Sequence, residues 1–169
     1  DSKYWEELKT LEHLNPKVLS SFIKPSVAVK SKVVEEDPRE KGLRKILNFG
    51  HTLGHAIESY FLVEKDKQRL LHGEAIAIGM VLEAYLSTHC SGLSQEEALD
   101  IKTTFKRFYP KTEITKQDIE AILALLRHDK KNKAGRVNFV LLNKIGTPAI
   151  DIEVPQALFE KAFDYYTSA

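Results

Sequence analysis

The chain has 169 residues, a single cysteine and a formal net charge of +1 at pH 7. That length suits one domain with a core of its own. Nearly balanced charge gives no electrostatic case for a nucleic acid or a membrane surface as partner, and no apolar run reaches the length of a membrane span. Cys90 cannot form an internal disulfide and is expected to pack in an apolar helix, which fits a reducing, cytoplasmic setting.

Hydrophobic periodicity predicts several helices in the first half of the chain. A short amphipathic helix is expected over residues 4–13, and a second over 16–36, which Pro25 would kink or split. After a charged loop, helical spacing resumes over 43–62. Residues 72–89 are apolar on most sides, which is typical of a central, buried helix.

The second half shows capping signals and one hairpin. Further helices are expected over residues 95–108, 115–126 and 155–166. Strands are expected over 136–142 and near 149–153. Neither βαβ alternation nor a G-x-G-x-x-G motif occurs, so these residues do not form a dinucleotide-binding fold by themselves. The predicted fold class is mainly α, one helical domain over 1–169 with one small β hairpin.

Three of the six histidines lie within 22 residues of one another: His51, His55 and His72. Imidazole is the commonest neutral ligand for zinc and similar ions. One helix face presents both His51 and His55, and an antiparallel return would bring His72 to the same place. A histidine pair at this spacing also arises by chance on many helices.

Glycines flank these histidines at positions 50, 54 and 73. Because glycine costs about 1 kcal/mol relative to alanine inside a helix, the three indicate close approach of a backbone or a ligand. His13 and His89 have no such setting and are interpreted as surface or core residues.

Cationic and amide side chains form a second group of candidates. Arg44 and Asn48 are four residues apart just before the first histidine, and Lys30 ends an apolar stretch upstream. Lys130 and Lys131 lie between a predicted helix and a strand. Such residues suit a substrate with carboxylate and phosphate groups, although a solvated charged surface is the plainer interpretation of any single lysine.

These motifs together closely resemble 3-dehydroquinate synthase, over nearly the whole chain from about residue 4. The segments that carry the resemblance are Lys30, 42–44, 47–58, 71–80, 129–132, 141–142 and 145–146. The resemblance implies a phosphate-eliminating lyase of the shikimate pathway to aromatic amino acids. Such an enzyme converts 3-deoxy-arabino-heptulosonate 7-phosphate to 3-dehydroquinate with NAD and a zinc or cobalt ion, and is typically a homodimer.

The resemblance also assigns roles to particular residues. It makes His51 and His72 metal ligands, and it directs His55 to the substrate phosphate and to proton movement, where spacing alone would make it a third ligand. Substrate-binding roles fall to a further set, of which Lys30 and Asn48 also count as catalytic candidates. That set is Lys30, Arg44, Asn48, His55 and one of Lys130 or Lys131, with Lys130 favoured.

Two features depart from the family pattern. The third metal ligand, a glutamate in an A-E-x-x-K-like segment, is expected upstream of Lys3 and does not occur here, and neither does the NAD-binding amino-terminal domain. We therefore expect the chain alone to be inactive and to bind metal weakly. The stretch 61–70 also looks longer than usual for the family.

Three alternatives remain at this point. A sister sugar-phosphate cyclase would share the histidines and NAD but take another sugar phosphate, whereas Arg44 favours a carboxylate-bearing substrate. A metal-dependent alcohol or glycerol dehydrogenase would share a two-domain plan, but the arrangement of Asn48, His51 and His55 speaks against it. A non-enzymatic helical interaction domain would bind no metal.

Overall fold

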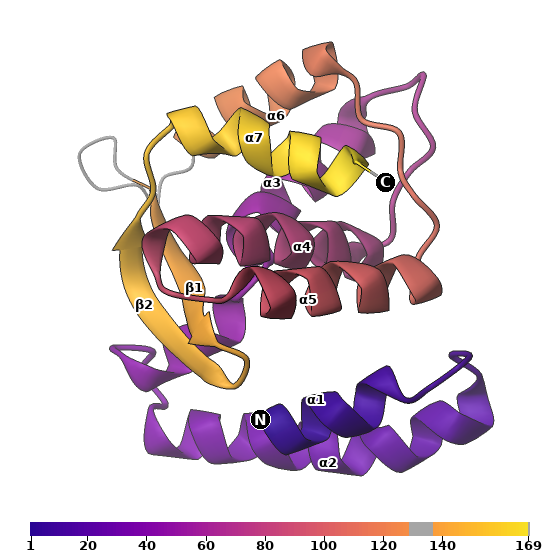
Figure 1. Cartoon of the computed structure of the whole chain (residues 1–169), viewed down its shortest axis with the longest axis vertical. Coiled ribbons are helices and arrows are strands. Elements are labelled where there is room, and N and C mark those ends of the chain that lie inside the picture. Colours follow the sequence, from indigo (N-terminus) through magenta and orange to yellow (C-terminus); the bar gives the residue numbers. More distant parts are fainter. Residues whose placement is uncertain (129–136, 169) are drawn as a thin grey trace.

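The structure, a computed structural model, describes residues 1–128 and 137–168, apart from the side chains of 127 and 128 (Figure 1). Within those ranges it is mainly α-helical with one two-stranded antiparallel sheet, so the predicted fold class is confirmed. The elements in chain order are α1 (Ser2–Lys9), α2 (Pro16–Glu36), the 3-10 helix η1 (Leu43–Asn48), α3 (His51–Val63), α4 (His72–Cys90), α5 (Gln95–Phe108), α6 (Lys116–His128), β1 (Asn138–Lys144), β2 (Thr147–Glu153) and α7 (Ala157–Thr167).

Helix α4 is the centre of the molecule, as its apolar sequence predicts. It packs against α3, α5, α7 and β1, which surround it in Figure 1. Leu82 and Leu86 are fully buried on α4, and Leu53, Leu141 and Phe163 come from three of the neighbouring elements to meet the same core. Removing this apolar surface from water is the main stabilising term in a domain of this kind. Cys90 is half-buried against the same core, which confirms its predicted packing role.

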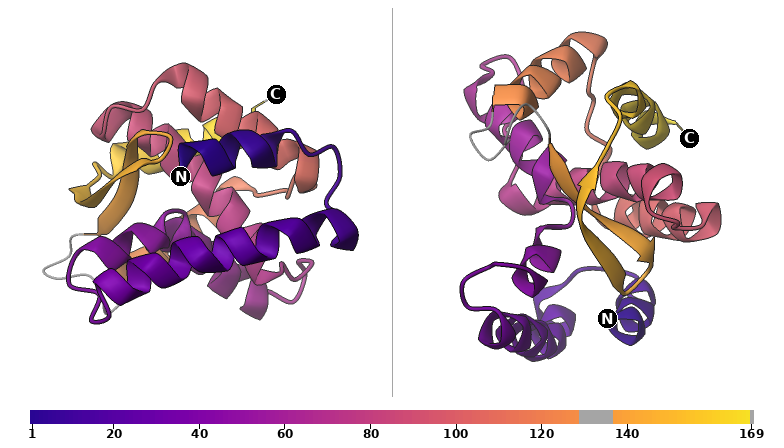
Figure 2. Two further views of the ribbon diagram at one scale, coloured as in Figure 1. Left: turned by 90° about the horizontal axis from the view of Figure 1, so that it is seen from below. Right: turned by 90° about the vertical axis from the view of Figure 1, so that its left-hand side faces the viewer.

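Helices α1 and α2 form an antiparallel pair at one end of the molecule (Figures 1 and 2). Neither helix contains a buried residue. The pair is held to the body by apolar and polar contacts: Trp5 packs against a core cluster and its indole donates to Asp100 on α5 at 3.0 Å, while Arg107 donates to the Lys9 carbonyl at 2.6 Å. The hairpin turn at Gly146 also lies against the start of α1.

Two expectations about this half of the chain need correction. Of the two outcomes expected at Pro25, a kink or a split, the split does not occur, because α2 runs from Pro16 to Glu36. The Ser21 carbonyl that loses its helical partner belongs to an exposed residue, where water can satisfy it. The helical stretch over 43–62 is also interrupted, because Gly50 adopts a left-handed conformation (φ +82°) between η1 and α3.

The capping signals are confirmed in the second half. Ser94 Oγ accepts from the Glu97 N–H, and the Glu97 carboxylate accepts from the Ser94 N–H. Glu97 also accepts from the Ile145 N–H at 2.9 Å, so this helix start holds the hairpin turn. Strand β1 begins and ends two residues later than predicted, and β2 begins two residues earlier and ends at the predicted residue 153; residue 136 lies outside the described residues. Within residues 1–128 and 137–168, no helix combines the length and hydropathy needed to cross a bilayer.

Candidate metal centre

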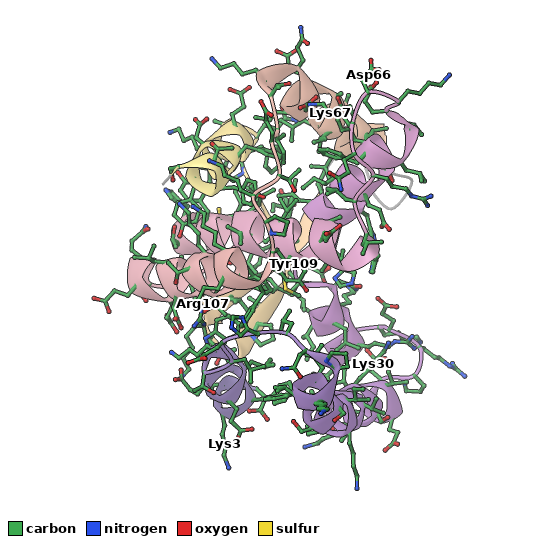
Figure 3. The ribbon with its side chains drawn as sticks, turned by 90° about the vertical axis from the view of Figure 1, so that its right-hand side faces the viewer. Lys3, Lys30, Asp66, Lys67, Arg107 and Tyr109 are labelled. Atoms are coloured by element: carbon green, nitrogen blue, oxygen red, sulfur yellow. The ribbon has the colours of Figure 1, made fainter. Side chains whose placement is uncertain are left out.

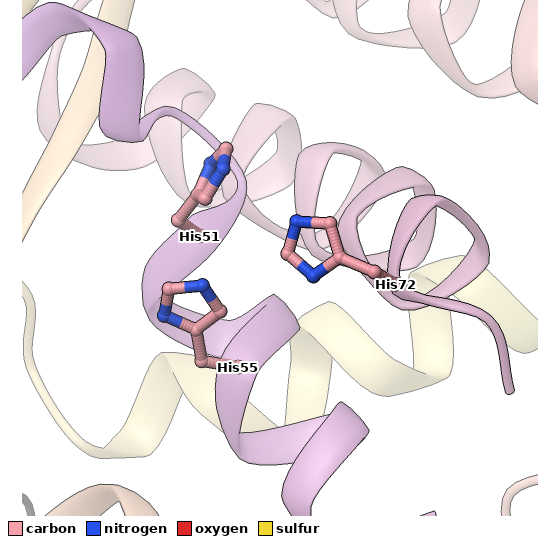
Figure 4. Close-up of side chains that lie close together, drawn as sticks. All are labelled: His51, His55 and His72. Carbon is pink, nitrogen blue, oxygen red and sulfur yellow. The ribbon is translucent and has the colours of Figure 1, made fainter.

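His51, His55 and His72 come together at the surface where α3 and α4 meet (Figure 4). Each imidazole offers one nitrogen, and these nitrogens lie within 4.8 Å of one another. The ring centroids are 5.3 Å apart for His51 and His55, and His72 is 5.9 Å from each of them. Half-buried His51 and the two exposed imidazoles form a neutral nitrogen donor set that fits zinc or cobalt.

The path of the two helices explains why residues 17 or more positions apart in sequence meet here. Close contacts join Gly50 to Met80 and Gly54 to Ile76, so α3 and α4 pass each other in opposite directions. The first residue of α4, His72, thereby reaches the face of α3 that carries His51, His55 and Glu58. The predicted antiparallel return is therefore confirmed.

Glycines allow the two helices to approach at backbone distance. A Cβ on Gly79 would lie 2.0 Å from the Gly50 carbonyl oxygen, and one on Gly54 would lie 2.7 Å from an Ile76 methyl carbon. The predicted close approach is therefore confirmed for Gly50 and Gly54. It is wrong for Gly73 as a protein contact, because no described atom lies within 4 Å of its Cβ position.

Two of the imidazoles have an oxygen partner on their Nδ1 atom. His72 Nδ1 lies 3.0 Å from a carboxylate oxygen of Glu58, and His51 Nδ1 lies 3.2 Å from the Phe49 carbonyl oxygen. A carboxylate or carbonyl that accepts from one ring nitrogen fixes the tautomer and leaves the other nitrogen to bind a metal. The sequence interpretation gave Glu58 no role, although His51, His55 and Glu58 share a helix face at i, i+4 and i+7.

A buried glutamate lies behind the cluster. Glu83 on α4 is 0% exposed, and its two carboxylate oxygens accept from the Gly50 N–H at 2.6 Å and the Leu53 N–H at 3.1 Å. Burial raises the pKa of Glu83, and the backbone donors at the start of α3 oppose that rise. The sequence interpretation missed this residue as well. A single charged residue in the apolar run of α4 is the signal that would have indicated it.

The predicted substrate residues Arg44 and Asn48 lie on η1, directly before α3. Asp37 anchors η1 by accepting from three backbone N–H groups, and those of Gly42, Lys41 and Arg44 lower its pKa. The Arg44 guanidinium donates to the Pro38 carbonyl at 3.2 Å. Asn48 donates to the carboxylate of Glu40, a residue with left-handed backbone (φ 51°). Both side chains are therefore engaged with the loop before η1.

Lys30 lies on the exposed surface of α2, the helix that packs against η1. Figure 3 labels it at the α1–α2 end of the molecule, away from Asp66 and Lys67 at the opposite end. Lys130 and Lys131 fall outside the described residues. The structure thus brings the three histidines together, and it places Lys30, Arg44 and Asn48 on the adjoining α2–η1 unit.

Solved structures that match this fold include sugar-phosphate cyclases. A 2-deoxy-scyllo-inosose synthase complexed with carbaglucose-6-phosphate, NAD+ and Co2+ matches with a TM-score of 0.72 and 27% identity, over 92% of this chain and 42% of that chain. The 2-epi-5-epi-valiolone synthase from Streptomyces hygroscopicus subsp. jinggangensis, with NAD+ and Zn2+ bound, shares the fold at a TM-score of 0.66 and 24% identity, over 90% of this chain and 41% of that chain. The class defined by this fold is the carboxy-terminal helical domain of a cyclase-like protein.

Sequence relatives narrow the class further. The family model "3-dehydroquinate synthase C-terminal" matches residues 1–132. The 3-dehydroquinate synthase of Parabacteroides distasonis is 39% identical over 156 residues, which is 92% of this chain and 44% of that protein. The Solibacter usitatus enzyme is 41% identical over 142 residues, which is 83% of this chain and 39% of that protein. The chain therefore belongs to the 3-dehydroquinate synthase C-terminal family, and it spans less than half the length of these relatives.

Proposed function

We propose that this chain is the metal- and substrate-binding domain of a 3-dehydroquinate synthase, which converts 3-deoxy-arabino-heptulosonate 7-phosphate to 3-dehydroquinate and phosphate. The observation that carries the proposal is the convergence of His51, His55 and His72 in a chain of this family. The curated relatives at 39% and 41% identity are 3-dehydroquinate synthases, whereas the sister cyclases are more distant at 24% and 27%. That difference favours this reaction over another sugar-phosphate cyclisation.

His51 and His72 are the proposed metal ligands. Their Nδ1 atoms have oxygen partners in Phe49 and Glu58, which is the outer contact that metal-binding histidines make. A bound zinc or cobalt ion would polarise the substrate hydroxyl that NAD oxidises. His55 is proposed to face the substrate phosphate and to hold or move a proton there.

Arg44, Asn48 and Lys30 are proposed to bind the carboxylate and phosphate of the substrate, together with Lys130. A guanidinium binds such planar or tetrahedral anions through two parallel N–H donors. Asp37 holds the backbone of η1 in place and so presets the positions from which Arg44 and Asn48 would turn to the substrate. The first turn of α4, which begins at His72, borders the same place, and the start of a helix favours an anion.

The proposal is tested by titrating Zn2+ into this chain in a calorimeter, with and without the separately produced NAD-binding domain of the Parabacteroides distasonis relative. His51→Ala, His55→Ala and His72→Ala are titrated in parallel. We expect weak binding by the chain alone and tight binding by the pair, lost in His51→Ala and His72→Ala and retained in His55→Ala. The reason is that the sequence offers no A-E-x-x-K segment to supply a third ligand.

Equally tight binding by the chain alone, lost in His55→Ala, would make His55 the third ligand and would overturn its proposed substrate role. Phosphate release by the pair identifies the substrate. Turnover of 3-deoxy-arabino-heptulosonate 7-phosphate supports the proposal, and turnover of glucose 6-phosphate or sedoheptulose 7-phosphate instead would favour a sister cyclase. Turnover by this chain alone would show that its predicted inactivity is wrong.

A further inference from the structure

The start of α3 has no cap of its own. The residue before His51 is Gly50, which has no side chain, and no side-chain cap hydrogen bond comes from within the α3 segment. The first N–H groups of a helix lack intrahelical partners and need an acceptor. Here the acceptor comes from another helix, because Glu83 on α4 binds the N–H groups of Gly50 and Leu53 on either side of His51.

A buried carboxylate is an energetically costly way to cap a helix. A serine, threonine or aspartate at position 50 would satisfy the Leu53 N–H locally, whereas burying a carboxylate completely requires that it be compensated by hydrogen bonds. Gly50 also sits so close to α4 that an added Cβ would lie 2.9 Å from the Met80 backbone nitrogen. The contact between Glu83 and the start of α3 therefore fixes that start against α4 itself.

Helix α4 also carries His72, eleven residues before Glu83. Helix α4 thus carries His72 at its first residue, and Glu83 in the middle of the same helix holds the backbone on both sides of His51. The carboxylate touches no imidazole in these contacts, so any effect on the histidines passes through the backbone of residues 50–53.

We propose that Glu83 is a positioning residue, which sets the place of the His51 imidazole relative to His72 by holding the start of α3 on α4. The proposal rests on the proposed metal site. Glutamine is the informative replacement, because its amide oxygen can accept from one N–H while its NH2 group faces the other. Both N–H groups cannot be satisfied, and the start of α3 must shift or turn.

The test compares Glu83→Gln with Ser87→Ala in the full 169-residue chain paired with the NAD-binding domain of the Parabacteroides distasonis relative, because the chain alone is expected to bind metal weakly. Ser87 is a matched control one turn further along α4. It is also 0% exposed and also accepts from a distant backbone N–H, that of Leu142 on β1 at 3.0 Å. Each variant therefore loses one buried acceptor and is destabilised, but only Glu83→Gln affects α3. The readouts are Co2+ affinity, the visible absorption spectrum of bound Co2+, and amide hydrogen exchange at Gly50 and Leu53.

For Glu83→Gln we expect faster exchange at one or both of these amides, a Co2+ affinity reduced about 10-fold, and an altered Co2+ spectrum, since loss of an outer support typically costs about 10- to 100-fold in metal binding. For Ser87→Ala we expect the parent spectrum and affinity. Parent-like Co2+ binding in Glu83→Gln, or an equal loss in Ser87→Ala, would overturn the role of Glu83 alone. Failure of the paired parent chain to bind Co2+ would overturn the metal site and this role with it.

Discussion

Replacing Gly79 with alanine should separate the two helices that carry the histidines. The new Cβ would lie 2.0 Å from the Gly50 carbonyl oxygen and 2.7 Å from the Gly54 nitrogen, where ordinary contact begins at 3.4 Å. Those two atoms form the first backbone hydrogen bond of α3, at 3.0 Å. Neither is the free end of a flexible side chain, so α3 and α4 must move apart by more than 1 Å or that bond must break. We expect the free energy of unfolding to fall by about 3 kcal/mol.

Gly73→Ala on the same helix is the matched control. Its Cβ meets none of the described atoms within 4 Å. Alanine should therefore raise stability by about 0.5 kcal/mol through its better helix propensity. Urea unfolding followed by circular dichroism measures both variants. If Gly79→Ala were as stable as Gly73→Ala, the close packing of α3 on α4 would be wrong.

Two further predictions concern carboxylates. Although burial raises the pKa of Asp118, hydrogen bonds from Lys67 and Tyr60 help lower it to about 2. Its contribution of about 2 kcal/mol is therefore fully present above about pH 4 and lost as the pH falls toward 2, which urea midpoints across that range would show. Glu58→Gln should weaken Co2+ binding about 10-fold or more with little change in unfolding free energy, because its carboxylate orients the exposed His72.

Each of these has its own control. Asp118→Asn should reduce the acid-dependent loss between pH 4 and 2 by the contribution of Asp118, and an unchanged slope in that variant would assign the loss to other groups. Glu58→Gln is compared with Glu64→Gln at the end of α3, away from the imidazoles in sequence. Equal Co2+ affinities for these two variants would contradict the orienting role of Glu58.

Local signals in the sequence were sufficient for most elements. The apolar run 72–89 predicts a central helix because a helix with no polar face is stable in water only when it is buried. The capping pair Ser94 and Glu97 marks a helix start because both orphan donors there are satisfied within four residues. The incorrect expectations concern features that depend on contacts outside the local sequence. Whether Pro25 ends a helix depends on what surrounds the freed carbonyl, and the break at Gly50 depends on contact with α4.

For the candidate site, too, the sequence indicated some features and only the tertiary structure decided others. The sequence by itself indicated which side chains form the candidate metal site, since the chemistry and spacing of His51, His55 and His72 predicted that they come together, and its motifs indicated the family. Only the tertiary structure decided what supports them. Glu58 contacts His72 across 14 residues of chain, and Glu83 contacts Leu53 and Gly50 across 30 and 33 residues. Such contacts are fixed by how α3 and α4 pack, and no periodicity along one helix records which carboxylate on another will face it.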